Sequence, residues 1–274
     1  MKELTDKELR TLQLEMTSYI DEICRENGIE YSLGGGSLLG AIRHKGYIPW
    51  DDDIDLVLTR ANYEKLLSVL MENCPEHYSL IYYQVRPTYL PFAKLYDNRT
   101  YFTSKLDNLN KGTGVFVDLF PMDVMPENAE ERDEFKKEIQ QSAIKLASSA
   151  PGLVYASASK WYYFLGKMVL WFPRHLANMG KNKKIAQEVD QQMQKYNATD
   201  EQLVGYVYSG YKTEYFKREI FDSYEDVAFE DYTFRKIKNH DGYLSMLYGD
   251  YMTLPPENKR VNHSYYHWYW KTEK

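Results

Sequence analysis

The chain has few of the features that mark an exported or disulfide-stabilised protein. Its 274 residues include only two cysteines, Cys24 and Cys74, which form neither a Cys-x-x-Cys pair nor a disulfide framework. The first residues contain no apolar stretch of the kind found in a signal peptide. We therefore expect a protein of the reducing cytoplasm.

The chain also lacks an excess of positive charge. The formal net charge is −6, whereas nucleic-acid backbones select basic surfaces. We therefore expect no nucleic-acid partner and only a small nucleotide as ligand. Hydrophobic residues make up 43% of the chain, enough for a substantial core. Repeats, low-complexity tracts and Pro/Gly/Ser-rich linkers are absent, so we expect one unit over residues 1–274.

The hydrophobic patterns predict an α+β fold. Residues 1–125 are expected to form a small mixed β-sheet flanked by helices, and residues 126–274 a helical half that completes the site. Thr5 and Glu8 form a capping box for the first helix. The other expected helices cover 38–42, 63–71, 129–148, 162–171, 183–196 and 240–247, and the expected strands cover 29–33, 53–58, 78–85, 91–96 and 115–119.

A run of acidic residues begins one of these strands. In an extended chain Asp51, Asp53 and Asp55 project to one side, and such a set of carboxylates suits Mg²⁺ or Mn²⁺. A solvated acidic loop is the alternative, but the run leads directly into the apolar residues 56–58. An EF-hand loop needs Gly at position six and Glu at position twelve, where this chain has Leu56 and Asn62.

A glycine-rich turn precedes the acidic run. Gly34, Gly35 and Gly36 allow close approach of the backbone to a ligand, and Ser37 is predicted to cap a short helix. The N–H groups at that helix start would face a phosphate, with Arg43 near the far end. The two segments together indicate phosphate chemistry.

Three blocks of sequence resemble the LicD family of bacterial phosphotransferases. A glycine-serine turn followed by Asp-x-Asp is similar to the polymerase-β type of nucleotidyltransferase fold, and residues 31–55 match the LicD pattern more closely. The second block is Phe116-Val-Asp-Leu-Phe-Pro-Met-Asp123, and the third is Tyr248-Gly-Asp-Tyr-Met-Thr-Leu-Pro-Pro256, continuing to Lys259, Arg260 and His263. Upstream of the third block, Ile237-Lys238 departs from the Ile-Pro that the family often carries.

The resemblance implies Mg²⁺-dependent transfer of phosphocholine, or a related alcohol phosphate, from a CDP-linked donor to a sugar hydroxyl of a cell-surface glycan, with release of CMP. Lipopolysaccharide and teichoic acid are such glycans, and the acceptor of such a pathway is often lipid-linked at the inner membrane face. Asp53, Asp55 and Asp118 would be catalytic and hold the metal together with Asp51. The donor would be bound by Gly35, Gly36, Ser37, Arg43, Lys94, Lys259, Arg260 and His263.

Several of these residues have a second interpretation. Asp118 lies between apolar residues on a short predicted strand, which favours a pocket edge, and Asp123 is the second candidate for the third carboxylate. Lys94 is either a phosphate contact or a surface lysine whose stem lies along apolar residues. His263 and His267 have a spacing that zinc uses on a helix, but no further ligand accompanies them.

Aromatic residues raise two further hypotheses. A quaternary ammonium binds to aromatic faces, and the chain holds 26 tyrosines and ends in an aromatic run at 265–270, although such clusters also form ordinary cores. Residues 161–172 are apolar and aromatic but too short to span a bilayer. They form either a packed helix or an interfacial helix with peripheral membrane contact.

Two other functions use the same residues. A nucleotidyltransferase would move an NMP group to a small molecule and release pyrophosphate. A non-catalytic metal- or glycan-binding protein is the third alternative, which the set of acids and the glycine turn disfavour.

Overall fold

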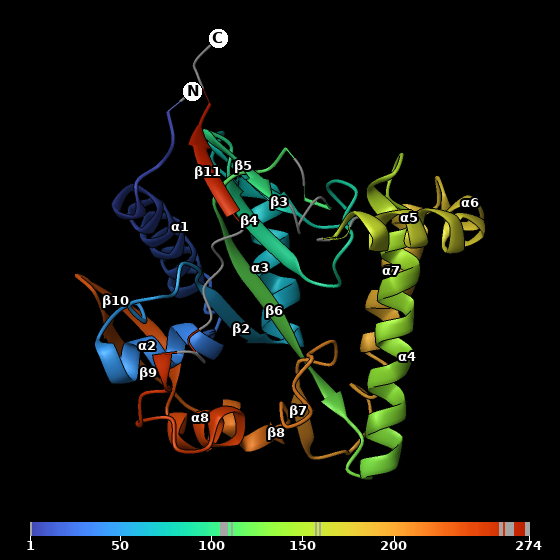
Figure 1. Cartoon of the computed structure of the whole chain (residues 1–274). Helices are drawn as coiled ribbons and strands as arrows, with labels where there is room; N and C mark the ends of the chain where they lie inside the picture. The colour runs from blue at the N-terminus through green and yellow to red at the C-terminus, as the bar shows by residue number, and fades with distance from the viewer. Residues whose placement is uncertain are drawn as a thin grey trace.

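The computed structural model describes residues 2–104, 109–110, 112–156, 158, 160–257, 260 and 266–271, and Figure 1 shows their arrangement. The helices are α1 Asp6–Glu26, α2 Gly35–His44, α3 Arg60–Asn73, α4 Ala129–Ser148, α5 Trp161–Leu170, α6 Phe172–Asn178, α7 Asn182–Met193 and α8 His240–Tyr248, with 3₁₀ turns η1 Val154–Ala156 and η2 Arg218–Phe221. The strands are β1 Ser32–Leu33, β2 Asp55–Thr59, β3 Tyr78–Ile81, β4 Ala93–Asp97, β5 Thr100–Ser104, β6 Phe116–Met125, β7 Leu203–Gly205, β8 Phe216–Lys217, β9 Tyr224–Phe229, β10 Tyr232–Ile237 and β11 Tyr266–Trp270.

A mixed sheet forms the centre of the molecule. Its strands lie in the order β1-β2-β6-β4-β3, and β7 and β8 extend the sheet beside the end of β6. The strands β2 and β6 are parallel, whereas β4 pairs antiparallel with β6 and with β3. The predicted α+β class with a mixed sheet is therefore confirmed.

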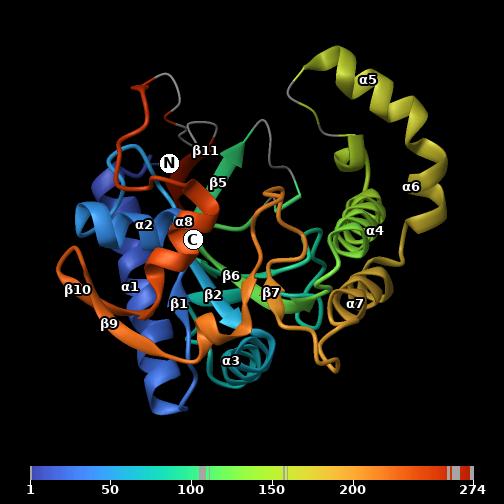
Figure 2. The same ribbon diagram turned by 90° about the horizontal axis from the view of Figure 1, so that it is seen from below.

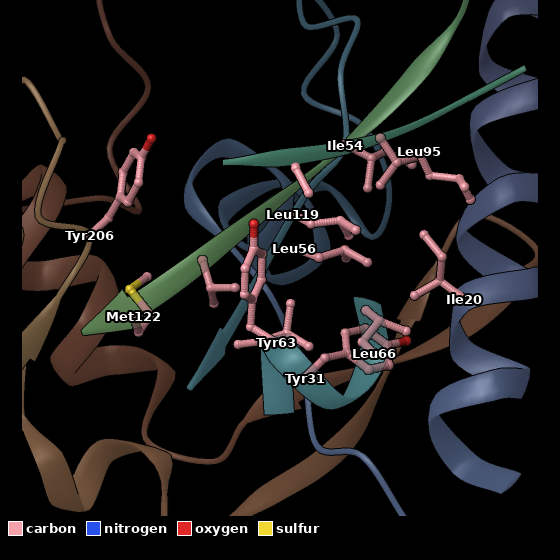
Figure 3. Packing of buried hydrophobic residues seen from close by; sticks show 14 of the residues in the cluster. Ile20, Tyr31, Ile54, Leu56, Tyr63, Leu66, Leu95, Leu119, Met122 and Tyr206 are labelled. Atoms are coloured by element: carbon pink, nitrogen blue, oxygen red, sulfur yellow. The ribbon is translucent and has the colours of Figure 1, made fainter. Parts of the chain in front are cut away.

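Helices α1 and α3 pack on one face of this sheet. The capping box predicted at Thr5 and Glu8 is present at the start of α1. Figure 3 shows Leu56 and Leu119 of the sheet packed with Leu66 of α3 and with Ile20 of α1. Leu66 is fully buried, so its truncation to alanine should cost about 2–5 kcal/mol of stability. Because side chains alternate along a strand, the neighbours of Leu56 and Leu119 project from the opposite face.

The second half of the chain is less helical than predicted. Helices α4, α5, α7 and α8 form close to the expected ranges, and the short helix α6 directly after α5 was not predicted. Strands β7 to β11 were missed, so the expectation of a helical half over 126–274 is wrong in this respect. Strands β7 and β8 are very short, β9 is partly exposed, and the partner of β11 is distant in sequence, so these strands give weak local signals.

The last strand returns to the beginning of the chain. Strand β11 pairs antiparallel with β5, with Trp268 opposite Phe102. The backbone N–H of Leu4 donates to the carbonyl of Trp268 at 2.8 Å, and that of Trp270 donates to the carbonyl of Lys2 at 2.9 Å. β11 consequently lies between β5 and residues 2–4.

Candidate active site

A row of charged side chains crosses three neighbouring strands on the face of the sheet opposite α1 and α3. Asp55 at the start of β2 is the register partner of Asp118 on β6, and Asp118 is the partner of Lys94 on β4. Lys94 Nζ lies 2.7 Å from Asp118 Oδ1. Only 4% of Lys94 is exposed, so the interpretation of Lys94 as a surface lysine is wrong.

The acidic run is only partly a strand. β2 begins at Asp55 rather than at the predicted residue 53, so residues 51–54 form the loop before it. Helix α1 supports this loop: Arg10 Nη2 donates to the carbonyl of Asp51 at 3.1 Å, and Gln13 Nε2 donates to that of Asp52 at 2.7 Å. The acidic loop is thus held against the start of the charged row.

Burial and like charges disfavour ionisation of Asp55. Removal of its carboxyl from water raises its pKa well above the usual value, and the charges of Asp53, Asp118 and Asp51 raise the pKa further, against a smaller lowering by Lys94. Four predicted carboxylates therefore lie close enough to interact. The site has an excess of negative charge that a cationic ligand would relieve.

The glycine turn packs against this acidic loop. Helix α2 begins at Gly35, and Gly34 is its N-cap residue. A Cβ added to Gly36 would lie 2.8 Å from Asp51 Oδ2, and one added to Gly35 would lie 3.5 Å from Asp55 Oδ2. Gly35 also has a φ of +45°, which favours glycine. Glycine is thus required here for close contact with the carboxylates.

Ser37 does not cap α2 as predicted, because it lies within the helix. Its hydroxyl instead accepts a hydrogen bond from the backbone N–H of Asp55 at 2.9 Å. The N–H of Gly34 donates to the carbonyl of Asp55 at 2.8 Å. These two hydrogen bonds connect the glycine turn to Asp55 at the start of β2.

A cavity of about 140 Å³ opens beside the charged row. Its wall combines acidic, basic and aromatic groups, contributed by Gln13, Asp52, Asp53, Lys94, Phe116, Asp118, Tyr266 and Trp268. Lys94 Nζ lies 3.6 Å from the centre of the Phe116 ring, and the rings of Phe116 and Trp268 are 5.5 Å apart. Two members of the C-terminal aromatic run therefore face the cavity.

Arg43 contacts the segment after α8, and Arg260 contacts the residue that precedes the acidic run. Arg43 Nη1 donates to the carbonyl of Tyr251 at 2.7 Å, which ties α2 to the segment after α8. The guanidinium of Arg260 lies 4.6 Å from the centre of the Trp50 ring, and Trp50 directly precedes the acidic run. Their role in binding a donor stays a prediction. Lys259 and His263 lie outside the described residues.

Asp123, the second candidate for the third carboxylate, is part of a buried ion pair. Arg60 Nε donates to Asp123 Oδ1 at 2.8 Å, and Asn197 Nδ2 donates to the same oxygen at 2.7 Å. Arg60 also contacts Asp190 at 2.8 Å. These contacts join α3, β6 and the segment after α7, which favours a structural role and leaves Asp118 as the carboxylate of the charged row.

Several residues of the site escaped sequence analysis. The hydroxyl of Tyr243 accepts a hydrogen bond from the Gly35 N–H at 3.2 Å. Tyr248 also lies beside this glycine, because a Cβ added to Gly35 would be 3.6 Å from the Tyr248 hydroxyl oxygen. Burial raises the pKa of both tyrosines above the usual range. Gln13 offered a detectable signal, because it is a polar residue at a buried position of the apolar face of α1.

The donor atoms suit a hard cation, although the described residues do not form a complete cage. Within the described ranges, no group of three or more His, Cys, Asp or Glu side chains is arranged to hold a metal ion. Mg²⁺ commonly binds to one or two carboxylates and completes its shell with water and substrate phosphates. Asp55 and Asp118 are neighbours on β2 and β6 and lie beside the glycine turn. Two carboxylates next to a turn that a phosphate can approach fit this mode of Mg²⁺ binding. The metal remains a prediction.

Zinc binding by His263 and His267 is disfavoured by the sequence even on a helix, and His267 lies on β11 rather than on a helix. His267 Nδ1 lies 3.4 Å from Glu3 Oε1, on the pairing of β11 with the start of the chain. His263 lies outside the described residues.

Comparison with known proteins gives a consistent result. Residues 28–151 match the family model described as LicD/FKTN/FKRP, nucleotidyltransferase domain. The chain is 31% identical to the lipopolysaccharide cholinephosphotransferase LicD of Haemophilus influenzae over 268 residues, which cover 96% of this chain and 97% of the relative. It is also 50% identical to the human ribitol 5-phosphate transferase FKRP over 48 residues, covering 18% of this chain and 10% of that protein.

Proposed function

Because the chain belongs to the LicD/FKTN/FKRP family of phosphotransferases, we propose that it transfers phosphocholine, or a related alcohol phosphate, from a CDP-linked donor to a sugar hydroxyl of a cell-surface glycan. The observation that carries the proposal is the row of Asp55, Asp118 and Lys94 beside the glycine turn. The carboxylates of this row can bind a cation and accept a proton. The glycine turn beside them leaves room for a diphosphate to approach the backbone.

The reaction moves one phosphoryl group between two oxygens. The acceptor hydroxyl attacks the phosphorus that bears the alcohol, a new P–O bond forms, and the bond to the CMP oxygen breaks with release of CMP. Asp118 accepts the proton of the attacking hydroxyl. Lys94, buried at 2.7 Å from Asp118, balances negative charge on the donor and on the neighbouring carboxylates.

Mg²⁺ is the proposed cofactor, with Mn²⁺ as its substitute. Asp55 and Asp118 would hold it, with Asp53 and Asp51 adding negative charge nearby, and it would neutralise charge on the phosphoryl oxygens. The excess of carboxylates around Asp55 supports this assignment. Treatment with EDTA should abolish turnover, and added Mg²⁺ should restore it.

The aromatic wall of the cavity supports choline as the transferred alcohol. A quaternary ammonium cannot donate a hydrogen bond and is held by ring faces and nearby negative charge. Tyr266 and Trp268 supply the rings, and Asp52 and Asp53 supply the charge, whereas the Phe116 ring is already covered by the ammonium group of Lys94. The substitution Trp268→Leu should raise KM for CDP-choline by roughly 2- to 30-fold and leave KM for CDP-ribitol nearly unchanged. Equal effects on both donors would remove choline as the preferred alcohol.

CMP release tests the reaction class. Wild-type protein with Mg²⁺ and a bacterial surface-glycan fraction is incubated with CDP-choline, CDP-ribitol or CTP. We expect CMP from CDP-choline, reduced by about 100-fold or more in Asp55→Asn, while Asp133→Asn on the exposed surface of α4 retains activity. Pyrophosphate from CTP, without CMP from either CDP-alcohol, would instead establish a nucleotidyltransferase. Thermal melting of each variant separates loss of activity from loss of fold.

A further inference from the structure

Helices α5 and α6 leave a large apolar surface uncovered. They lie at the periphery, beyond α4 and α7 (Figure 2), and α5 has no buried residue. Trp161, Val169 and Leu170 are 74%, 68% and 78% exposed. We define the α5–α6 face by its exposed apolar residues, Trp161, Tyr162, Tyr163, Leu165, Val169, Leu170, Phe172 and Leu176. Large exposed apolar side chains gathered on two consecutive helices indicate an interaction site rather than ordinary exposure.

The segment is nevertheless fixed to the body of the protein. The hydroxyl of Tyr155 donates to the carbonyl of Met168 at 2.8 Å, and the rings of Tyr155 and His175 stack at 4.2 Å. His175 Nδ1 contacts the carbonyl of Ser148 at 2.9 Å, and Asn178 Nδ2 donates to the hydroxyl of Ser148 at the same distance. These inner contacts hold the two helices in place while their outer side chains remain exposed.

The charge of this region is opposite to that of the whole chain. Residues 139–187 contain no Asp or Glu, although the chain has a formal net charge of −6. The same stretch contains the basic residues Lys145, Lys160, Lys167, Arg174, Lys181, Lys183 and Lys184. Basic residues also lie among the rings: Lys160 Nζ is 5.8 Å from the centre of the Tyr162 ring, and Arg174 is 5.5 Å from that of Trp171.

We propose that the α5–α6 face docks on the surface of an anionic lipid bilayer. Tryptophan and tyrosine favour the boundary between headgroups and acyl chains, leucine and valine enter the acyl region, and lysine and arginine bind anionic headgroups. Among the described residues no helix is both long enough and apolar enough to cross a membrane, so α5 would lie in the interface. The absence of Asp and Glu from residues 139–187, together with basic side chains beside the exposed rings, favours an anionic lipid surface over a protein partner.

This docking surface does not depend on the transfer reaction. If both proposals hold, docking places the cavity near an acceptor that is carried on a lipid. The test therefore uses binding alone, so that failure of one proposal leaves the other intact.

Vesicle flotation of the full chain tests the proposal. We expect the wild type to float with vesicles of phosphatidylcholine and phosphatidylglycerol at a ratio of 7:3 and to float weakly with phosphatidylcholine alone. In the double variant Trp161→Ser/Leu170→Ser, the fraction of protein bound to vesicles should fall at least five-fold. The double variant Lys160→Gln/Arg174→Gln should reduce binding to anionic vesicles only. The matched control Met71→Ser/Val85→Ser removes exposed apolar side chains elsewhere and should bind as the wild type.

Two outcomes would overturn the proposal. One is the absence of wild-type protein from the floating fraction with anionic vesicles. The other is a dimer in sedimentation analysis that dissociates in Trp161→Ser/Leu170→Ser without any vesicle binding by the wild type, which would assign the face to a second copy of this chain. The substituted side chains are mostly exposed, so circular dichroism and melting should match the wild type in every variant.

Discussion

Lys94 and Asp118 form a buried ion pair across β4 and β6, with Nζ and Oδ1 2.7 Å apart. The two residues are only 4% and 8% exposed, and Asp55 lies next to Asp118 in the same row. The single ammonium group therefore stands at the end of a row of carboxylates. Its removal would take away the ammonium group that is paired with Asp118.

The substitution Lys94→Met should reduce both stability and turnover. Loss of one partner of a buried pair costs about 3–5 kcal/mol, measured as a lower free energy of unfolding in urea. The double variant Lys94→Met/Asp118→Asn should recover a large part of this stability but no activity, since the proposed proton acceptor is lost. Equal stabilities of the single and double variants would show that the two groups do not stabilise each other.

The substitution Gly36→Ala should separate activity from stability. Its Cβ would lie 2.8 Å from Asp51 Oδ2, so the carboxylate must move and the proposed metal site is disturbed. Alanine also favours a helix over glycine by about 1 kcal/mol, which keeps the protein folded. We expect at least a ten-fold loss of CMP release with little change in Tm. Gly166→Ala on α5 meets no atom within 4 Å and should retain activity.

The substitution Arg60→Met should destabilise the protein from a position outside the charged row. It would leave Asp123, which is fully buried, without the guanidinium that binds both of its oxygens. A loss of about 3–5 kcal/mol in the free energy of unfolding is expected. Arg25→Met removes an exposed pair with Asp21 and should cost about 1 kcal/mol or less. Similar losses in both variants would contradict this assignment.

Cys74 should react slowly with alkylating agents at neutral pH. Burial raises the pKa of its thiol to about 11, so only about one molecule in a thousand carries the thiolate at pH 8. Labelling by iodoacetamide, followed by mass spectrometry, should accelerate about ten-fold per pH unit between pH 8 and 10. Cys24 is almost fully buried and should react more slowly still, as measured in Cys74→Ser. Rapid labelling of Cys74 at pH 7 would contradict the raised pKa.

Local signals in the sequence predicted much of the first half of the fold. The capping box at Thr5 and Glu8 located α1, and apolar runs located β2, β4 and the start of β6. Asp118 was identified because an acid between apolar residues indicates a pocket edge, and the structure places it beside Asp55. Its role in catalysis, like that of the other site residues, stays a prediction.

Contacts between distant segments could not be predicted in the same way. The pairing of Lys94 with Asp118 depends on the register of β4 against β6, which no local pattern specifies. The positions of Tyr266 and Trp268 in the cavity wall depend on β11 pairing with β5 across most of the chain. Alternating aromatic residues in β10, Tyr232 and Phe234, were a local signal that the prediction of a helical second half overlooked.

The return of β11 to β5 also bears on the order in which the protein becomes functional during its synthesis. Asp55, Lys94 and Asp118 are translated well before Tyr266 and Trp268, which close the cavity beside them. A nascent chain that has folded its sheet would therefore still have an open cavity. The ability to hold a donor is expected only once translation has reached the final strand.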